Sequence, residues 1–290
     1  MLRKSLIIAA AALAVAACSK EVASGGDAPS GSGYISFKSY TRGQTRSDVT
    51  GDNLEKINVL AKYCEPQVSS TWYKYFNTEF TKSNGRFDTG YPWPVFGYMD
   101  FWASNMPIDD ADTSIALTDA LKDVVVAPKT RVESVSESVQ LQFKHIFSKV
   151  TLRAKTDTSI RKATIKSVYI FLNDKPTKYS FAGDSVSLSG SQWKKSFREG
   201  SANIIHGDFQ DVALSGEYIA PQSAKVIIGY DVYGTETGSS VLLKSATDTL
   251  GPYNFEAGKN VILQLTFNVD DNTINFTSDV AEFSDSAPEP

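Results

Sequence analysis

Apolar and polar residues alternate along most of the chain after residue 33. Near the middle, four apolar residues share one parity: Val139, Leu141, Phe143 and Phe147. This period of two residues is typical of a β-strand with one buried face. Directly afterwards the apolar residues occupy the opposite parity: Val150, Leu152 and Ala154. Because a one-residue shift would turn the buried face outward, we expect a bulge, a kink or a change of sheet around Ser148–Lys149.

The same alternation predicts strands throughout the first half: Tyr34–Tyr40, Ile57–Tyr63, Thr71–Phe80 and Val95–Ala103. In the first of these strands we expect Ile35 and Phe37 to point inward. The dipeptide Asn84-Gly85 favours a tight hairpin turn, because both residue types tolerate a positive φ. The two prolines in Tyr91–Pro94 exclude a central strand at that point, because proline has no backbone donor.

Residues 112–123 are the one good helical candidate. Asp112 can cap the helix, and the following apolar residues could form a stripe: Ile115, Leu117, Ala120 and Leu121. The second half offers only short strand candidates: Ile165–Leu172, Tyr179–Phe181, Val186–Leu188, Ala202–Ile205, Lys225–Tyr233, Val241–Lys244, Val261–Phe267 and Thr273–Thr277. Many short strands at short spacing are typical of β-sandwiches.

The length of 290 residues indicates about two domains, at roughly 100–200 residues each. Together with the parity change, this length predicts an all-β fold with two tandem β-sandwich domains, residues 34–147 and 148–290. One short helix is expected in the first domain.

The first residues are typical of an export signal rather than of a fold. Arg3-Lys4 precede an apolar run, Ser5–Val15, that is shorter than the roughly 20 residues of a membrane span. Small residues end the run directly before Cys18, which is the pattern of a lipoprotein signal peptide. We therefore predict a signal peptide of residues 1–17, cleavage between Ala17 and Cys18, and a lipid on Cys18. The alternative is an ordinary signal peptide with a chance cysteine at the cleavage point.

Residues 18–33 are rich in Ser and Gly, so we interpret them as a flexible tether. Once Cys18 carries lipid, Cys64 is the only remaining cysteine, and no disulfide can form within the mature chain. We expect Cys64 to be a small core residue and His145 to be structural.

Motifs of catalysis are missing from the sequence. There is no Gly-x-Ser-x-Gly, His-Glu-x-x-His or Cys-x-x-Cys motif, and the chain has two histidines. The acidic cluster Asp109, Asp110 and Asp112 could ligate calcium, but the glycine and distal glutamate of a calcium loop are absent, so a solvated loop and helix cap is favoured. The net charge of −4 gives no footprint for nucleic acid. We therefore expect no enzyme, no cofactor and no metal site.

Aromatic residues cluster in the first half: Trp72, Tyr73, Tyr75, Tyr91, Trp93, Tyr98 and Trp102. Flat aromatic surfaces bind sugar rings, whereas aromatics at strand spacing more often form core and cross-strand pairs, which is the favoured interpretation. Three tripeptides fit an Asp-Ser/Thr-apolar pattern of O-glycosylation, although such tripeptides also arise by chance: Asp184–Val186, Asp248–Leu250 and Asp285–Ala287.

The middle of the chain, Leu141-x-Phe143-x-His145-x-x-Ser148-Lys149-Val150-x-Leu152, resembles the mid-chain motif of the fimbrillin family. These are surface lipoproteins that build pili on some Gram-negative anaerobes. Four flanking segments resemble the family as well: Asp100–Ala103, Lys122–Val125, Ile219–Gln222 and Gly258–Val261. With the N-terminus included, the resemblance spans nearly the whole chain.

The resemblance implies sandwich domains of transthyretin-like type, export as a lipoprotein to the outer membrane, and trimming after an arginine in the loop that follows the first strand. Here that arginine is Arg46, with Arg42 as second candidate. It also implies donor-strand exchange with other pilus subunits in a fimbria that supports adhesion to a host protein or glycan.

The chain departs from the family at its C-terminus. Val280–Phe283 is a plausible last strand, but the following Ser284–Pro290 is short, acidic and ends in proline. A stalk, tip or anchor role therefore stays open. The alternative is a glycan-binding outer-membrane surface lipoprotein that does not polymerise.

Overall fold

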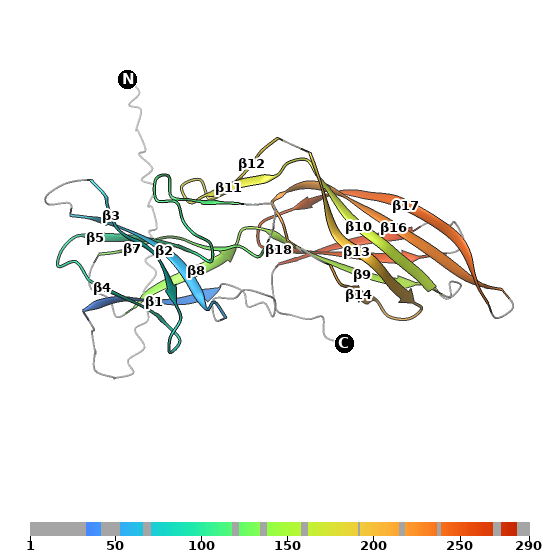
Figure 1. Cartoon of the computed structure of the whole chain (residues 1–290), viewed down its shortest axis with the longest axis horizontal. Helices are drawn as coiled ribbons and strands as arrows, with labels where there is room; N and C mark the ends of the chain where they lie inside the picture. The colour runs from blue at the N-terminus through green and yellow to red at the C-terminus, as the bar shows by residue number, and fades with distance from the viewer. Residues whose placement is uncertain are drawn as a thin grey trace, which may run out of the picture. The chain divides into compact units, whose positions relative to one another are not determined.

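All regular structure in the described part of the chain is β-strand (Figure 1). The computed structural model describes residues 33–41, 53–65, 71–117, 122–133, 138–157, 162–190, 192–214, 218–236, 239–268 and 274–282. Because these residues contain no helix, they contain none long and apolar enough to cross a membrane. The all-β class is confirmed.

A seven-stranded sheet occupies the first half, in the order β3-β2-β5-β7-β8-β1-β4. Its strands are β1 (Tyr34–Thr41), β2 (Lys56–Cys64), β3 (Tyr73–Thr81), β4 (Phe87–Pro92), β5 (Tyr98–Ser104), β7 (Val125–Val132) and β8 (Val139–His145). Strands β7 and β8 pair only at Val125–His145 and Val126–Lys144. The sheet is thus nearly divided into β4-β1-β8 and β3-β2-β5-β7. Apolar side chains from both parts share one core, among them Phe37, Phe143, Ile57 and Phe101.

Two sheets form the second half. One has the order β13-β10-β16-β17, with β10 (Lys162–Leu172), β13 (Trp193–Ile205), β16 (Gln222–Glu236) and β17 (Ser239–Phe255). The other has the order β14-β9-β18-β19, with β9 (Ser148–Thr156), β14 (Gln210–Val212), β18 (Lys259–Phe267) and β19 (Ile274–Glu282), while β15 (Tyr218–Ile219) also pairs with β9. A second core contains residues of both sheets, such as Ile170, Ile228, Leu152 and Leu263.

A small sheet joins elements from the two halves of the sequence. It has the order β12-β11-β6, with β6 (Ser114–Ala116), β11 (Pro176–Ser180) and β12 (Ser185–Leu188). Ile115 of β6 pairs with Tyr179 of β11. A third apolar cluster contains these two residues together with Ile146 and Phe147, which lie between β8 and β9.

The chain changes sheets at the predicted point. Strand β8 ends at His145 in the first-half sheet, and β9 begins at Ser148 in a sheet of the second half. Both strands alternate between buried and more exposed residues, with the buried parity shifted across Ile146–Phe147. Phe143 is buried in the first core and Val150 in the second. The parity change therefore marks a change of sheet, while the domain division at residues 147 and 148 and the transthyretin-like type stay predictions.

The predicted helix is wrong where the structure describes it. Residues 110–113 form a turn, and residues 114–116 form strand β6. Asp109 and Ser114 exchange two backbone hydrogen bonds of 2.8 and 3.2 Å across this turn. Strand β11, which lies more than 50 residues later in the sequence, pairs with β6. Pairing with a strand distant in sequence therefore outweighed the local helical pattern. Residues 118–121 of the predicted helix lie outside the described residues.

The turn at Asn84-Gly85 is confirmed, with φ values of 50° and 77°. Ser83 and Arg86 flank it and exchange backbone hydrogen bonds of 2.8 and 3.1 Å. Beyond this bridge the two strands separate: β3 pairs with β2, and β4 pairs with β1. The predicted hairpin therefore exists only at its tip.

Candidate functional site

Strand β1 fills a slot between β8 and β4, and this slot is the candidate functional site (Figure 1). β1 runs parallel to β8 from the pair Phe37–Val139 to the pair Thr41–Phe143. It runs antiparallel to β4, with Tyr34 opposite Pro92 and Phe37 opposite Phe87, and the register shifts between these pairs. The first strand of the described chain is thus inserted between two strands that come later in the sequence.

The inward side chains of β1 are part of the first core. Ile35 and Phe37 are both fully buried, as the alternation predicted. The Phe37 ring lies edge-on to Phe101 at 5.2 Å between centroids and 6.1 Å from Phe80. Burying one such side chain contributes about 1.5–3 kcal/mol. The slot therefore has an apolar floor that needs a strand with apolar residues at alternate positions.

Polar contacts hold the start of β1. The backbone nitrogen of Trp93 donates to the carbonyl of Gly33 at 2.9 Å, and the Thr89 hydroxyl donates to the carbonyl of Ile35 at 2.8 Å. At its other end β1 finishes at Thr41, directly before Arg42 in the sequence. Arg42 and Arg46 lie outside the described residues, as do Ala17 and Cys18.

The last strand repeats the apolar pattern of the first. β1 contains Ile35-Ser36-Phe37-Lys38-Ser39, and β19 contains Ile274-Asn275-Phe276-Thr277-Ser278. Ile, Phe and Ser therefore recur at the same alternate positions. Among the described strands, β19 lies at a sheet edge and pairs with β18 alone, from Lys259–Glu282 to Phe267–Ile274. Sequence reasoning missed this likeness because it divided residues 273–283 into two separate strand candidates.

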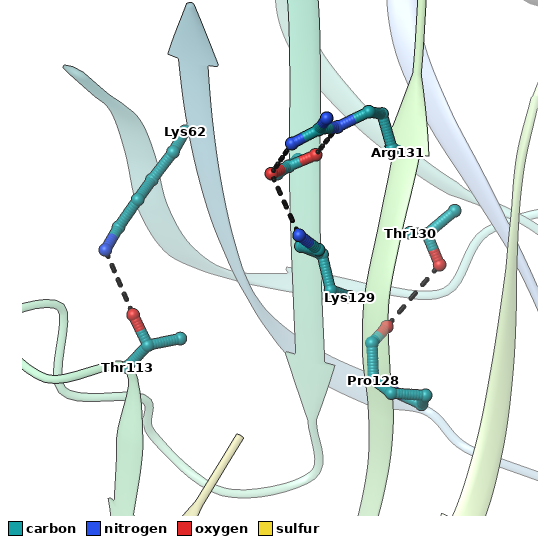
Figure 2. A network of polar contacts seen from close by, with 7 residues as sticks. Lys62, Thr113, Pro128, Lys129, Thr130 and Arg131 are labelled. Atoms are coloured by element: carbon teal, nitrogen blue, oxygen red, sulfur yellow. Dashed lines mark hydrogen bonds and ion pairs between the residues drawn. The ribbon is translucent and has the colours of Figure 1, made fainter. Parts of the chain in front are cut away.

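A charged network lies on the face of strands β5 and β7 that points away from the first core (Figure 2). Asp100 is 4% exposed and accepts two hydrogen bonds from Arg131, Nε to Oδ1 at 2.7 Å and Nη2 to Oδ2 at 2.9 Å. Lys129 approaches the same carboxylate at 3.8 Å. The bond to Asp100 raises the pKa of the Arg131 guanidinium above its usual value. The guanidinium also lies over the ring of Trp72 at 4.9 Å, so the network fixes β7 against β5.

His145 and Cys64 have the structural positions that we expected. The Nδ1 atom of His145 lies 2.7 Å from Oδ1 of Asp123, and both side chains are buried. Cys64 is buried at the end of β2. Among the described residues, no group of three His, Cys, Asp or Glu side chains is arranged to hold a metal ion. The carboxylate partner of His145 was missed because Asp123 precedes it by 22 residues.

The acidic cluster is a loop whose carboxylates bind lysines. Asp110 pairs with Lys74 and Asp112 with Lys178, both at 2.6 Å. Hydrogen bonds from these lysines are the main cause that lowers the pKa values of both carboxyls. The solvated-loop interpretation fits these contacts, whereas the helix cap is wrong, because a turn and β6 follow.

Most of the clustered aromatic residues pack in cores. Trp93 belongs to the first core, Tyr75 and Tyr91 pack against it, and Trp102 packs against the third cluster. Tyr73 is exposed at the start of β3. For the four packed residues, the core interpretation is confirmed.

Comparison with known proteins decides the family. The sequence profile described as fimbrillin-like matches residues 41–282, which is most of the chain. The chain belongs to the fimbrillin-like family. No curated protein matches the sequence significantly.

Solved structures with the same fold agree with this assignment. A fimbrial protein from Bacteroides vulgatus aligns with a TM-score of 0.52 at 11% identity, over 86% of this chain and 99% of that one. A candidate cell adhesion protein from Bacteroides ovatus aligns with a TM-score of 0.54 at 14% identity, over 86% and 97%. Another from Bacteroides uniformis gives 0.50 at 15% identity, over 87% and 100%. At these identities, the likeness establishes the fold of this fimbrillin-like chain.

Proposed function

We propose that this chain is a structural subunit of a cell-surface fimbria, which exchanges β1 for a strand of a neighbouring subunit after proteolytic trimming. The observation that carries the proposal is the position of β1. It lies between β8 and β4, places Ile35 and Phe37 in the core, and is followed directly in the sequence by Arg42 and, four residues later, Arg46. A cut after Arg46, or after Arg42, would make β1 a separate peptide.

Loss of that peptide would leave an unstable slot. Backbone groups of β8 and β4 that now pair with β1 would have no partner, and each costs about 1–3 kcal/mol when it stays buried and unpaired. The apolar floor around Phe101 and Phe80 would face water. An exposed strand edge above an apolar floor favours the addition of a strand from another chain.

Within the described residues, the best donor candidate is β19 of a second copy. It occupies a sheet edge, so its release breaks pairing with β18 alone. Its Ile274, Phe276 and Ser278 match the spacing of Ile35, Phe37 and Ser39. Donation from the end of one subunit into the slot of the next is a head-to-tail contact that does not close, so it would propagate as a filament.

The remaining parts of the proposal concern location. Removal of residues 1–17 and acylation of Cys18 would anchor the precursor in the outer membrane, with residues 18–33 as tether. Other fimbrial subunits would then be its partners, and a host protein or glycan would be the target of adhesion.

The test follows the size of the purified chain, residues 19–290, during digestion with an arginine-specific protease. Light scattering should show a monomer before cleavage and growing oligomers afterwards. The double variant Arg42→Ala/Arg46→Ala should stay monomeric under the same digestion, and lysine-specific cleavage serves as a second control.

A cut wild-type chain that retains residues 34–41 and stays monomeric at high concentration would overturn the polymerising role. A tip, anchor or glycan-binding role would then be favoured.

A further inference from the structure

The sheet β13-β10-β16-β17 (Figure 1) carries a row of one phenylalanine between two lysines across its outer face, here called the Lys–Phe–Lys row. Phe171 of β10 lies directly opposite Lys194 of β13 on one side and Lys225 of β16 on the other. The neighbours of Phe171 along β10, Ile170 and Leu172, are buried in the second core, so the row points away from that core. Both lysines are exposed and the phenylalanine is half-buried. The row is therefore a surface with an apolar centre between two positive charges.

Within the described ranges, no carboxylate pairs with either lysine of this row. Lys194 extends its Nζ atom over the ring of Tyr169, at 3.8 Å from the centroid, and Lys225 is exposed without an ion pair there. Lys166 of the same sheet is different, because it pairs with Asp231 at 2.7 Å. The row thus presents two uncompensated positive charges on a chain whose net charge is −4. An acidic ligand is the partner that fits this surface.

The segment that follows β19, residues 283–290, has the opposite charge. It contains two acidic residues, Asp285 and Glu289, and no lysine or arginine. The segment lies outside the described residues, but β19 fixes the point where it begins, because this strand ends with Glu282 opposite Lys259 of β18. The acidic segment therefore continues from a strand whose position is known.

The segment begins at the same end of the two second-half sheets as the row. β17 ends with Phe255 opposite Gln222 of β16, three residues before Lys225, and β18 begins at Lys259 after a three-residue connection. Among the described strands, β17 and β19 are sheet edges on the same side, because a four-residue connection joins the opposite edges, β13 and β14. Stacked sheets are about 10 Å apart and neighbouring strands about 5 Å. Eight extended residues span up to about 26 Å, so the segment can pass the β17 edge and reach the row.

The acidic segment also matches the row in spacing. Its two carboxylate residues are four positions apart, which is about 13 Å in an extended chain. The two lysines are on strands separated by two strand spacings, about 10 Å, and their long side chains cover the difference. Ala287 lies midway between the carboxylate residues and would pack on the Phe171 ring. The segment thus offers one negative charge for each lysine and a small apolar residue for the centre of the row.

We propose that residues 283–290 dock on the Lys–Phe–Lys row of their own chain and thereby hold β19 in its sheet. Exposed ion pairs are weak and are screened by salt, so the contact is reversible. Because the segment is tethered, its effective concentration at the row is about millimolar, which favours the row of the same chain over that of a second copy. The docking itself does not depend on the proposed strand exchange. Only its consequence rests on that proposal, namely that the docked segment delays the release of β19 to a neighbouring subunit.

The experiment is hydrogen exchange followed by mass spectrometry on the uncut chain, residues 19–290, at low ionic strength. Deletion of residues 283–290 should speed amide exchange in β19 about 3- to 10-fold, as expected for the loss of two exposed ion pairs. The double variant Lys194→Glu/Lys225→Glu should have the same effect with the segment present. In about 1 M salt, where the Debye length is about 3 Å, these differences should disappear.

Three further variants show whether the segment and the row act on each other. Deletion of the segment from the lysine double variant should cause no additional change in exchange. Asp285→Lys/Glu289→Lys in the lysine double variant restores opposite charges and should restore slow exchange in β19. Lys82→Glu/Lys122→Glu changes the net charge equally in the first half of the chain, so it is the matched control and should leave exchange in β19 unchanged.

The proposal is overturned if the deletion leaves exchange in β19 unchanged, or if the deletion and the lysine double variant have additive effects. It is also overturned if protection of β19 rises with protein concentration, since the segment of a second copy would then be the occupant. The cleaved chain gives a separate readout, because oligomers should form about 3- to 10-fold faster from the lysine double variant than from the wild type. If neither chain forms oligomers after cleavage while the exchange results hold, the strand exchange fails and the docking stands.

Discussion

Strands β1 and β18 occupy similar positions in the two halves of the chain. Each is flanked by one parallel and one antiparallel neighbour: β8 and β4 for β1, β9 and β19 for β18. Both bury alternate apolar side chains, such as Phe37 in β1 and Leu263 in β18. The two parallel neighbours, β8 and β9, are consecutive strands that cross from one sheet to the other.

The two strands differ in how firmly the backbone holds them. β18 pairs without a register shift along its whole length, with β9 from Asn260 to Phe267 and with β19 from Lys259 to Phe267. β1 pairs with β8 only from Phe37 onward and reaches β4 with a register shift. β18 also continues into its neighbour β19, whereas β1 is far in sequence from both of its neighbours. Two equally buried strands can therefore differ in how extensively their backbones are paired, and the proposed exchange would involve the less extensively paired strand, β1.

The largest effect is expected from removing β1 altogether. A chain that begins at Ser47 loses both Ile35 and Phe37, and large-to-small changes at buried Ile and Phe sites suggest a loss of about 5–10 kcal/mol in unfolding free energy. A synthetic peptide of residues 33–41 should bind this chain and raise its melting temperature, measured by circular dichroism. A peptide of residues 259–267, which copies β18, is the control and should not. Equal rescue by both peptides would contradict a slot specific for β1.

A smaller effect is expected from matched phenylalanine truncations. Phe37 in β1 and Phe267 in β18 are both buried, so Phe37→Ala and Phe267→Ala should each cost about 3–5 kcal/mol. Hydrogen exchange followed by mass spectrometry should separate them. Phe37→Ala should speed exchange in β1, β4 and β8, whereas Phe267→Ala should speed exchange in β9, β18 and β19. If either variant speeds exchange equally in both sets, the halves unfold as one unit and the proposed division into two domains fails.

The sequence was sufficient to predict those strands in which apolar and polar residues alternate regularly. The strand at residues 34–40, its inward Ile35 and Phe37, and the change of face after Phe147 all follow from alternation, because each strand has one buried face. Strands β13 and β17 are much longer than predicted. Residues 245–249 of β17 are polar or small, and they lie on a sheet-edge strand where half-exposed positions need no apolar side chains.

The features that the sequence could not predict depend on which strands, distant in sequence, pair with each other and in which register. Ile115 fits a helical stripe as well as a strand, and only pairing with Tyr179 decides for the strand. The Asp100–Arg131 pair likewise requires the alignment of β5 with β7. The slot itself follows from the order β8-β1-β4, which no local pattern contains. The likeness between β1 and β19, in contrast, was visible in the sequence.

The smallest effect on stability is expected from substitutions at two turn glycines. One precedes β4, which is a neighbour of β1, and the other precedes β18. Gly85 leads toward β4, and Gly258 leads directly into β18, with φ values of 77° and 68°. A Cβ atom would meet nothing within 4 Å at Gly85 and only the His145 carbonyl oxygen at 3.7 Å at Gly258. Steric clash is therefore excluded at both sites, and the cost of Gly85→Ala or Gly258→Ala should be the backbone cost of the left-handed conformation, about 1–2 kcal/mol. Urea unfolding should give similar losses of unfolding free energy for the two alanine variants and smaller losses for Gly85→Asn and Gly258→Asn, because asparagine tolerates this conformation better.

A much larger loss of unfolding free energy for Gly258→Ala would show that this turn also supports the passage of the chain from β8 to β9. The backbone nitrogen of Gly258 donates to the Phe147 carbonyl in this passage, at 3.0 Å. In that case β18 would be held by its strand pairs and also by the segment between β8 and β9, through the turn at Gly258. β1, in contrast, is connected to this segment only through its pairing with β8.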